Sequence, residues 1–274
     1  MRTWLFAPGH EARKVSKALA GDADRVVLDW EDAVPGGHKQ AAREVTLAAL
    51  RPLDVPALQR VAVRVGSPAG PDFAADAEAL EGWPLGAVMI PKVESAAEVE
   101  AAAELDVDLV VLLESARGID RASELAAAHP RVRWLAFGPL DLLADLGGSW
   151  SASGEEHLYG RSRVPIAARS ARLRGGALDG PWPLLDDEQG LRRDSELGRR
   201  LGYCGRLLVH PRQVQPVREV YAPRPEEIER ARRIVDAARD GAAAGRGALR
   251  VDGRMVDPPV IRWAERILSE AEEG

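Results

Sequence analysis

The chain has 274 residues, of which 46% are hydrophobic and 29% are charged, a composition typical of a globular protein and not of a disordered or membrane protein. Its formal charge of −6 creates no net field that would attract a polyanion, so nucleic acid is not an expected partner. A single cysteine excludes an internal disulfide and a cysteine-based zinc site.

The start of the chain and its apolar runs bear on the compartment. No apolar run approaches the roughly 20 residues that a membrane helix needs. The apolar run at residues 4–7 breaks at Pro8 and Gly9, which makes it too short for a secretory signal. We therefore expect a cytoplasmic protein without a membrane partner. The cysteine, Cys204, has apolar neighbours and is expected to be a small core residue.

Short apolar runs alternate along the chain with segments of helical periodicity. Residues 11–21 and 95–105 are two of these helical segments. The runs that predict strands are residues 4–7, 25–30, 60–65, 86–90, 109–113, 134–137 and 205–210, with a weaker run at 175–182. Eight strands alternating with helices favour an α/β fold of the (β/α)8 TIM-barrel type over an open sheet.

The C-terminal part of the chain follows a different pattern. Residues 225–240 predict a long amphipathic helix, and residues 241–250 are a Gly- and Ala-rich joint. Residues 251–274 predict a turn and one terminal helix, too small to fold alone. We predict a barrel domain over residues 1–240 and a C-terminal segment over residues 241–274 that packs on another structure.

Ionisable residues follow nearly every predicted strand. They are Asp29, Glu31, Asp32, Arg64, Lys92, Glu114, Asp141, Asp179 and His210. In a TIM barrel the carboxyl ends of all strands surround one mouth, and catalytic groups come from those ends. The pattern therefore predicts an active site at this mouth.

Glu114 and Asp141 are the best-placed metal ligands in the sequence. They follow neighbouring strands, and oxygen ligands without clustered histidine or cysteine favour Mg²⁺, which takes one or two carboxylates. Two structural alternatives stay open. Glu114 could form a salt bridge with Arg117 or Lys92, and Asp141 could be favoured by the dipole of the helix that it begins.

The turn that contains Asp141 could also bind an anion. Pro139 at the first helical position would leave the N–H groups of Leu140, Asp141 and Leu142 unpaired within the helix, where a carboxylate could bind. Arg64 could clamp another anionic group bidentately. The structural alternative for Arg64 is an ion pair with Glu31 or Asp32 inside the barrel.

The ordered motifs resemble one family. In chain order they are RTWLFAPG, VVLDWEDAV, VAVRV, MIPKVES, LLESARG, LAFGPLDLLADLG, LYGRSRV, GRLLVHPRQ and VDGRMVDPPV. They are similar to the citrate lyase beta subunit-like proteins of the HpcH/HpaI aldolase and citrate lyase family, which is related to malyl-CoA lyase. Two departures from the family pattern are Gly66, where an asparagine is usual, and Trp182, in a loop that could shape the acyl pocket.

The resemblance implies a site and an assembly. It implies a homotrimer or hexamer of TIM barrels, Mg²⁺ held by Glu114 and Asp141, and a substrate-binding Arg64. It also implies that Asp252 acts as acid or base from a C-terminal lid that covers a neighbouring subunit. We predict Arg64, Asp252, Glu31 and Asp32 as catalytic residues. We predict Arg64, Gly138, Pro139, Leu140 and Lys92 as substrate-binding residues.

The reaction implied by the resemblance is cleavage of a carbon–carbon bond in a 3-hydroxyacyl thioester. Citryl-CoA, or citryl bound to a carrier protein, giving oxaloacetate and an acetyl thioester is the leading case. The expected partners are thus an acyl-CoA or acyl-carrier thioester and a 2-oxo acid. A malyl-CoA lyase or thioesterase, an aldolase acting on a free hydroxy-oxo acid, and an accessory subunit of a lyase complex are the alternatives.

Overall fold

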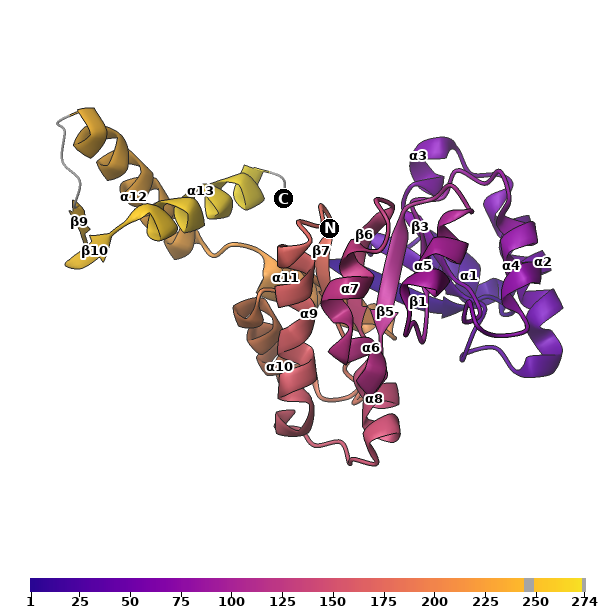
Figure 1. Ribbon diagram of the computed structural model, residues 1–274. Coiled ribbons are helices and arrows are strands. Elements are labelled where there is room, and N and C mark those ends of the chain that lie inside the picture. Colours follow the sequence, from indigo (N-terminus) through magenta and orange to yellow (C-terminus); the bar gives the residue numbers. More distant parts are fainter. Residues whose placement is uncertain (244–248, 273–274) are drawn as a thin grey trace. The chain divides into compact units, whose positions relative to one another are not determined.

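A closed parallel barrel forms the main part of the protein. The computed structural model describes residues 1–243 and 249–272 (Figure 1). Its eight parallel strands pair in sequence order, and β8 pairs with β1 to close the barrel. The strands are β1 (Thr3–Pro8), β2 (Arg25–Asp29), β3 (Val61–Arg64), β4 (Ala87–Ile90), β5 (Leu109–Leu113), β6 (Val132–Phe137), β7 (Gly176–Asp179) and β8 (Gly205–Leu208). The predicted TIM barrel is confirmed, and the weak run at 175–182 contains β7.

Helices connect the strands and cover the outside of the barrel. The α-helices up to β8 are α1 (Ala12–Leu19), α2 (Lys39–Leu50), α3 (Val55–Leu58), α4 (Phe73–Leu80), α5 (Ala96–Ala103), α6 (Ala116–Asp120), α7 (Ala122–Ala127), α8 (Pro139–Leu146), α9 (Leu158–Ser170) and α10 (Glu188–Leu201). Short 3₁₀ turns precede α2 and α9, at η1 (Gly36–His38) and η2 (Glu155–His157). A third, η3 (Pro211–Gln213), leads into α11 (Val214–Tyr221). Among the described residues, no helix has both the length and the apolar character needed to cross a bilayer.

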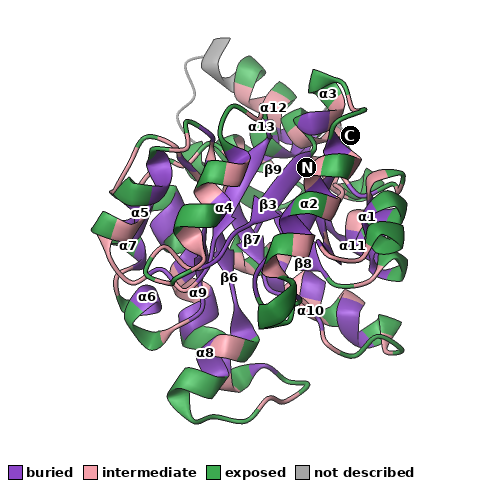
Figure 2. Ribbon diagram, turned by 90° about the vertical axis from the view of Figure 1, so that its right-hand side faces the viewer, coloured by how far each residue is buried: buried purple, intermediate pink, exposed green. Residues whose placement is uncertain are grey.

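Both faces of the barrel strands are buried, as Figure 2 shows by colour. One face fills the barrel interior, with Trp4, Val27, Ala62 and Leu112 among its members. The other face lies beneath the helices, because successive residues of a strand point to opposite sides. Burial on both sides explains why the strands are continuous apolar runs in the sequence.

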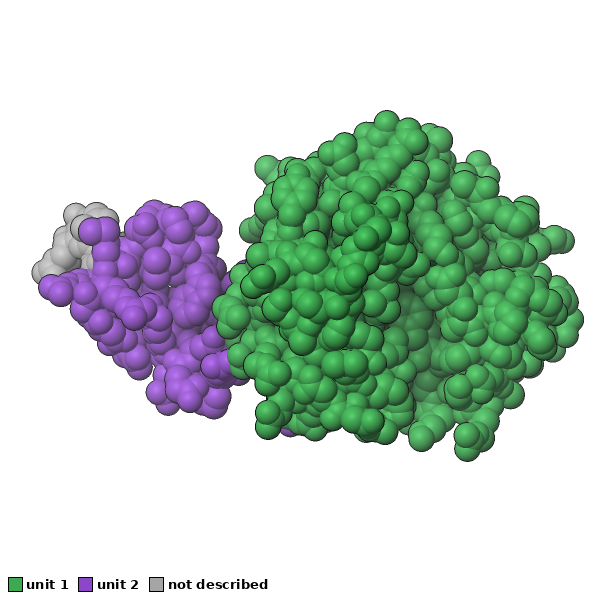
Figure 3. Space-filling view, turned by 90° about the horizontal axis from the view of Figure 1, so that it is seen from below, with its two compact units in different colours: residues 1–218 green, residues 219–274 purple. Residues whose placement is uncertain are grey.

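The chain divides into two compact units, Met1–Arg218 and Glu219–Gly274, which Figure 3 distinguishes by colour. The second unit contains α12 (Pro225–Ala243), the hairpin of β9 (Leu249–Val251) and β10 (Arg254–Val256), and α13 (Pro258–Glu272). Its small core joins Ala231 and Ile234 of α12 to Ile267 of α13. The predicted boundary at residue 240 falls inside α12, whereas the units separate at residue 218, because the terminal segment packs on this helix. Residues 244–248 of the predicted joint lie outside the described residues.

The expectation that Cys204 is buried is wrong. Cys204 precedes β8 and is exposed. Its Sγ lies 3.1 Å from the carbonyl oxygens of both Gly175 and Ala177. Cys204 lies just outside β8, which begins at Gly205.

Candidate active site

Glu114 is a buried carboxylate at the carboxyl end of β5. Leu112 belongs to the barrel core, and because alternate residues of a strand share a face, Glu114 faces the barrel interior as well. The residue is 3% exposed, and its Oε1 accepts the backbone N–H of Lys92 at 2.9 Å. Burial, and then the charge of Asp141, raises the pKa of Glu114 to about 8. The positive charge of Arg64 lowers the pKa of Glu114, but it does not offset the rise that burial causes.

The turn after β6 approaches Glu114 very closely. Gly138 is the N-cap of α8, Pro139 is its first residue, and Asp141 lies in its first turn. A Cβ at position 138 would lie 2.4 Å from the Cβ of Glu114 and 2.7 Å from its Oε2. Only glycine allows this approach, which brings the helix that carries Asp141 against Glu114.

The beginning of α8 exposes fewer backbone donors than the sequence predicts. The N–H of Leu142 donates to the carbonyl oxygen of Gly138 at 3.2 Å, so its predicted availability for an anion is wrong. Leu142 is the fourth helical residue, and its N–H closes the first helical hydrogen bond on the N-cap. Leu140 and Asp141 keep N–H groups without an intrahelical acceptor. These two groups can donate to a small anion.

Arg64 ends β3, and its guanidinium is held by Asp29, a strand-end carboxylate for which the sequence predicted no role of its own. Nε and Nη2 of Arg64 donate to Oδ1 and Oδ2 of Asp29 at 2.7 and 2.6 Å, a bidentate pair. Asp29 is 1% exposed and also accepts the backbone N–H groups of Glu31 and Ala33. The Nη1 atom lies 3.1 Å from the carboxylate of Glu31 and 3.8 Å from that of Asp32. The predicted structural alternative for Arg64 is thus present, together with the stronger Asp29 pair.

A strand pattern could have identified Asp29. Val27 lies in the barrel core, and Asp29 follows it by two residues on the same strand, so both face the interior. The register of β2 and β3 then places Asp29 directly beside Arg64. The sequence predicts that the side chain of Asp29 faces the barrel interior, but it does not predict the register that pairs Asp29 with Arg64.

Lys92 connects the two groups of charged residues. Its backbone N–H donates to Glu114, and its Nζ lies 2.9 Å from Asp32 and also bonds Glu31. Its φ of 55° is left-handed, which is uncommon for a residue other than glycine and is typical of functional sites. Lys92 therefore holds the acidic residues after β2 and Glu114 after β5 in one constellation.

The carboxylates at the mouth suit a hard cation. Within the described part of the chain, no group of three or more His, Cys, Asp or Glu residues is arranged to hold a metal. Mg²⁺ needs only one or two carboxylates because it keeps several waters and accepts substrate oxygens. Glu114 and Asp141 follow the paired strands β5 and β6, and the charge of Asp141 raises the pKa of Glu114. Two adjacent carboxylates, one of them buried without a sufficient counter-charge, fit Mg²⁺.

Two other strand-end residues do not contact these carboxylates. Asp179 follows Leu178 of the barrel core, so it faces the helices, where it pairs with Arg161 of α9. The Nδ1 atom of His210 accepts the backbone N–H of Arg212 at 3.1 Å and caps η3. Fewer of the strand-end residues therefore gather around Glu114 than the sequence predicted.

Asp252 belongs to the second unit. It lies in the two-residue turn between β9 and β10 and has a φ of 49°, followed by Gly253 with a φ of 76°. Positive φ at both central residues is the geometry of the tight hairpin turns that favour an Asp-Gly pair. Nη2 of Arg233 in α12 donates to Oδ2 of Asp252 at 3.0 Å, and both side chains are about half exposed. The local prediction of a turn is confirmed.

Comparisons with known proteins identify the family of the chain. Residues 2–211 match the family model described as HpcH/HpaI aldolase/citrate lyase, and residues 157–273 match one described as a C–C bond lyase of the TIM-barrel fold. A citrate lyase subunit beta-like protein of Deinococcus radiodurans is 39% identical, over 98% of this chain and 96% of that protein. A (3S)-malyl-CoA thioesterase of Cereibacter sphaeroides is 35% identical, over 99% and 94% respectively.

A solved structure extends the likeness to three dimensions. Protein CitE from Mycobacterium tuberculosis, crystallised with magnesium, acetoacetate and coenzyme A, superposes with a TM-score of 0.85. It is 37% identical, and the match covers 99% of this chain and 98% of CitE. Sequence and structural matches thus span nearly the whole chain, in agreement with the motif resemblance. The chain belongs to the HpcH/HpaI aldolase/citrate lyase family.

Proposed function

We propose that this protein is a Mg²⁺-dependent lyase that cleaves a carbon–carbon bond in a 3-hydroxyacyl thioester. The leading reaction converts citryl-CoA or a citryl-carrier thioester into oxaloacetate and an acetyl thioester. The observation that carries this proposal is the buried Glu114 beside Asp141, close to an arginine that Asp29 holds. Membership of the family supports a lyase, and the CitE complex with magnesium, acetoacetate and coenzyme A supports a thioester and an oxo acid as ligands.

The barrel residues would bind and orient the substrate. Glu114 and Asp141 would hold Mg²⁺, which supplies a Lewis acid for the charge that develops on the substrate oxygens. Asp29 holds Nε and Nη2 of Arg64, and Nη1 carries two N–H groups, so Nη1 would donate to the acid carboxylate or the thioester carbonyl beside its pair with Glu31. The N–H groups of Leu140 and Asp141 would donate to a substrate carboxylate at the start of α8.

Proton transfer completes the reaction. A base takes the hydroxyl proton, the carbon–carbon bond breaks, and its electron pair passes to the thioester as an enolate while the 2-oxo acid leaves. An acid then protonates the enolate carbon to give the acetyl thioester. We propose Asp252 of a neighbouring subunit for this exchange, in a homotrimer or hexamer. Asp32 is a second group that could carry the proton, because its side chain is 49% exposed, whereas Glu31 is bound between Arg64 and Lys92.

A second candidate reaction uses a malyl thioester. The relative from Cereibacter sphaeroides is a (3S)-malyl-CoA thioesterase, and it is 35% identical over 99% of this chain. Malyl-CoA has one carboxymethyl group fewer than citryl-CoA and presents the same hydroxyl and carboxylate to a metal. Hydrolysis of its thioester would release free coenzyme A, whereas lysis would release a 2-oxo acid.

The test incubates the purified protein and Mg²⁺ with citryl-CoA or malyl-CoA and measures two products separately. A 2-oxo acid without free thiol indicates lysis, and free thiol without a 2-oxo acid indicates hydrolysis. The Glu114→Gln variant is the matched control and should release neither product. If wild-type protein releases neither product, the same substrates are presented on an acyl carrier protein. Inactivity with both carriers would overturn the proposed lyase.

A further inference from the structure

The turn that carries Asp141 is fixed on two sides by glycines. On one side Gly138 lies against Glu114. On the other side Gly180, directly after β7, lies against Pro139. A Cβ at position 180 would lie 2.3 Å from the Cδ of Pro139 and 2.9 Å from the carbonyl oxygen of Phe137. No side chain fits there unless Pro139, the first residue of α8, moves.

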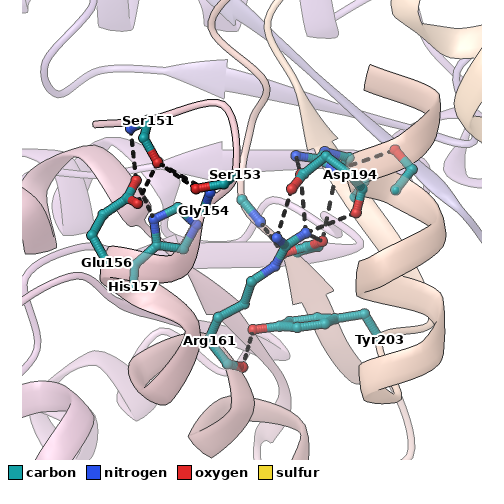
Figure 4. Close-up of polar contacts among 12 residues, drawn as sticks. Ser151, Ser153, Gly154, Glu156, His157, Arg161, Asp194 and Tyr203 are labelled. Carbon is teal, nitrogen blue, oxygen red and sulfur yellow. Dashed lines mark hydrogen bonds and ion pairs between the residues drawn. The ribbon is translucent and has the colours of Figure 1, made fainter. Parts of the chain in front are cut away.

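A buried ion network holds Gly180 in place. Its N–H donates to Oδ1 of Asp179 at 3.0 Å. Arg161 donates to the same Oδ1 through Nε at 2.9 Å, and through Nη1 to Asp194 at 2.7 Å (Figure 4). Arg206 bonds the other oxygen of Asp194. Asp179, Arg161 and Arg206 are each no more than 2% exposed, and the side chain of Asp194 is 12% exposed, so the network joins β7 and β8 to α9 and α10 largely away from solvent.

Such a network resists displacement. The two buried arginines form ion pairs with the two carboxylates, and moving one member would leave a buried charge unpaired, at a cost of several kcal/mol. A side chain added at position 180 therefore has to be accommodated by Pro139. Because Pro139 is two residues before Asp141, that movement would shift Asp141 relative to Glu114.

We infer that Gly180 is a positioning residue for Asp141: its missing side chain sets how closely the start of α8 approaches Glu114. The inference rests on the proposed Mg²⁺ site. It gives a role in the metal site to the residue directly after β7, a strand that supplies neither proposed ligand. The buried network of Asp179, Arg161, Asp194 and Arg206 provides the fixed support behind Gly180.

The experiment measures Mg²⁺ affinity by calorimetry, without substrate. Gly180→Ala should weaken Mg²⁺ binding about 10-fold, the lower end of the effect expected when the support of a metal ligand is disturbed. Gly37→Ala is the matched control, because a Cβ at Gly37 meets nothing within 4 Å, and it should bind like wild type. Pro139→Ala removes the two closest atoms that the new Cβ would meet, the ring Cδ and Cγ, and leaves only the looser contact with the carbonyl oxygen of Phe137. The double variant should therefore bind Mg²⁺ within about 3-fold of Pro139→Ala alone.

The outcomes separate this inference from the proposed metal site. If Asp141→Asn binds Mg²⁺ like wild type, the metal site itself is wrong. If Asp141→Asn loses binding but a folded Gly180→Ala keeps wild-type affinity, only the positioning role is wrong. If Gly180→Ala does not fold, the Mg²⁺ affinity of Pro139→Ala tests the inference instead. This substitution should weaken Mg²⁺ binding at least about 3-fold by loosening the turn, and an unchanged affinity would overturn the inference.

Discussion

Asp29→Asn tests whether a buried carboxylate sets the direction of Arg64. In the wild-type protein each oxygen of Asp29 accepts one N–H of Arg64 and one backbone N–H, from Glu31 at 2.9 Å and from Ala33 at 3.0 Å. Asparagine has the same shape but offers one oxygen and one NH₂ group. That NH₂ group would face two N–H donors, so one charge-assisted hydrogen bond and one backbone hydrogen bond are lost.

The expected magnitude follows from these two losses. A hydrogen bond to a charged group contributes about 1.5–3 kcal/mol and a neutral one about 1 kcal/mol. Because Asp29 is 1% exposed, water does not replace them, and we expect the free energy of unfolding to fall by about 3 kcal/mol. A guanidinium displaced by about 1 Å costs roughly 100-fold in rate, so kcat/KM should fall by about that factor.

The assay combines urea unfolding with thioester cleavage. Asp24→Asn is the control, because Asp24 also accepts two backbone N–H groups and pairs with an arginine, Arg218, but lies at the amino ends of β1 and β2. The control should lose stability and keep the wild-type kcat/KM. Wild-type kcat/KM in Asp29→Asn, or an equal loss of activity in both variants, would show that Asp29 does not set the direction of Arg64.

Further predictions concern the remaining site residues and one buried histidine. Arg64→Lys should lose most activity although it keeps the charge, because an ammonium cannot span both oxygens of a carboxylate; wild-type kinetics would leave Arg64 a structural role only. Glu114→Ala and Asp141→Ala should each abolish Mg²⁺ binding in calorimetry with an unchanged circular dichroism spectrum, and unchanged affinity in both would contradict the metal site. Inactive Asp252→Asn and Glu114→Gln proteins should regain part of the activity when their subunits exchange, and no recovery despite demonstrated exchange would exclude a shared site. Burial lowers the pKa of His157 below the value of about 6.5 in the unfolded chain, so unfolding takes up a proton below that pH. Wild-type protein should therefore lose stability in urea relative to His157→Gln as the pH falls from 7 to 5.

Local patterns in the sequence determined the fold and selected the proposed metal ligands. Seven continuous apolar runs and one weak run corresponded to the eight barrel strands, because a strand buried on both faces needs apolar residues throughout. Glu114 and Asp141 could be selected because the ends of adjacent parallel strands meet at one mouth. These features depend on residue type and spacing along the chain, which the sequence contains in full.

Contacts between distant strands were decided only by the tertiary structure. The strand register places Asp29 beside Arg64, and the barrel interior joins the backbone of Lys92 to Glu114. The weak strand β7 turns Asp179 outward into a buried network and brings Gly180 against the start of α8. Each of these pairs forms between segments far apart in the chain, so it depends on barrel closure and on side-chain direction. Apolar periodicity specifies which face of a strand is buried, but not which charged partner lies opposite it.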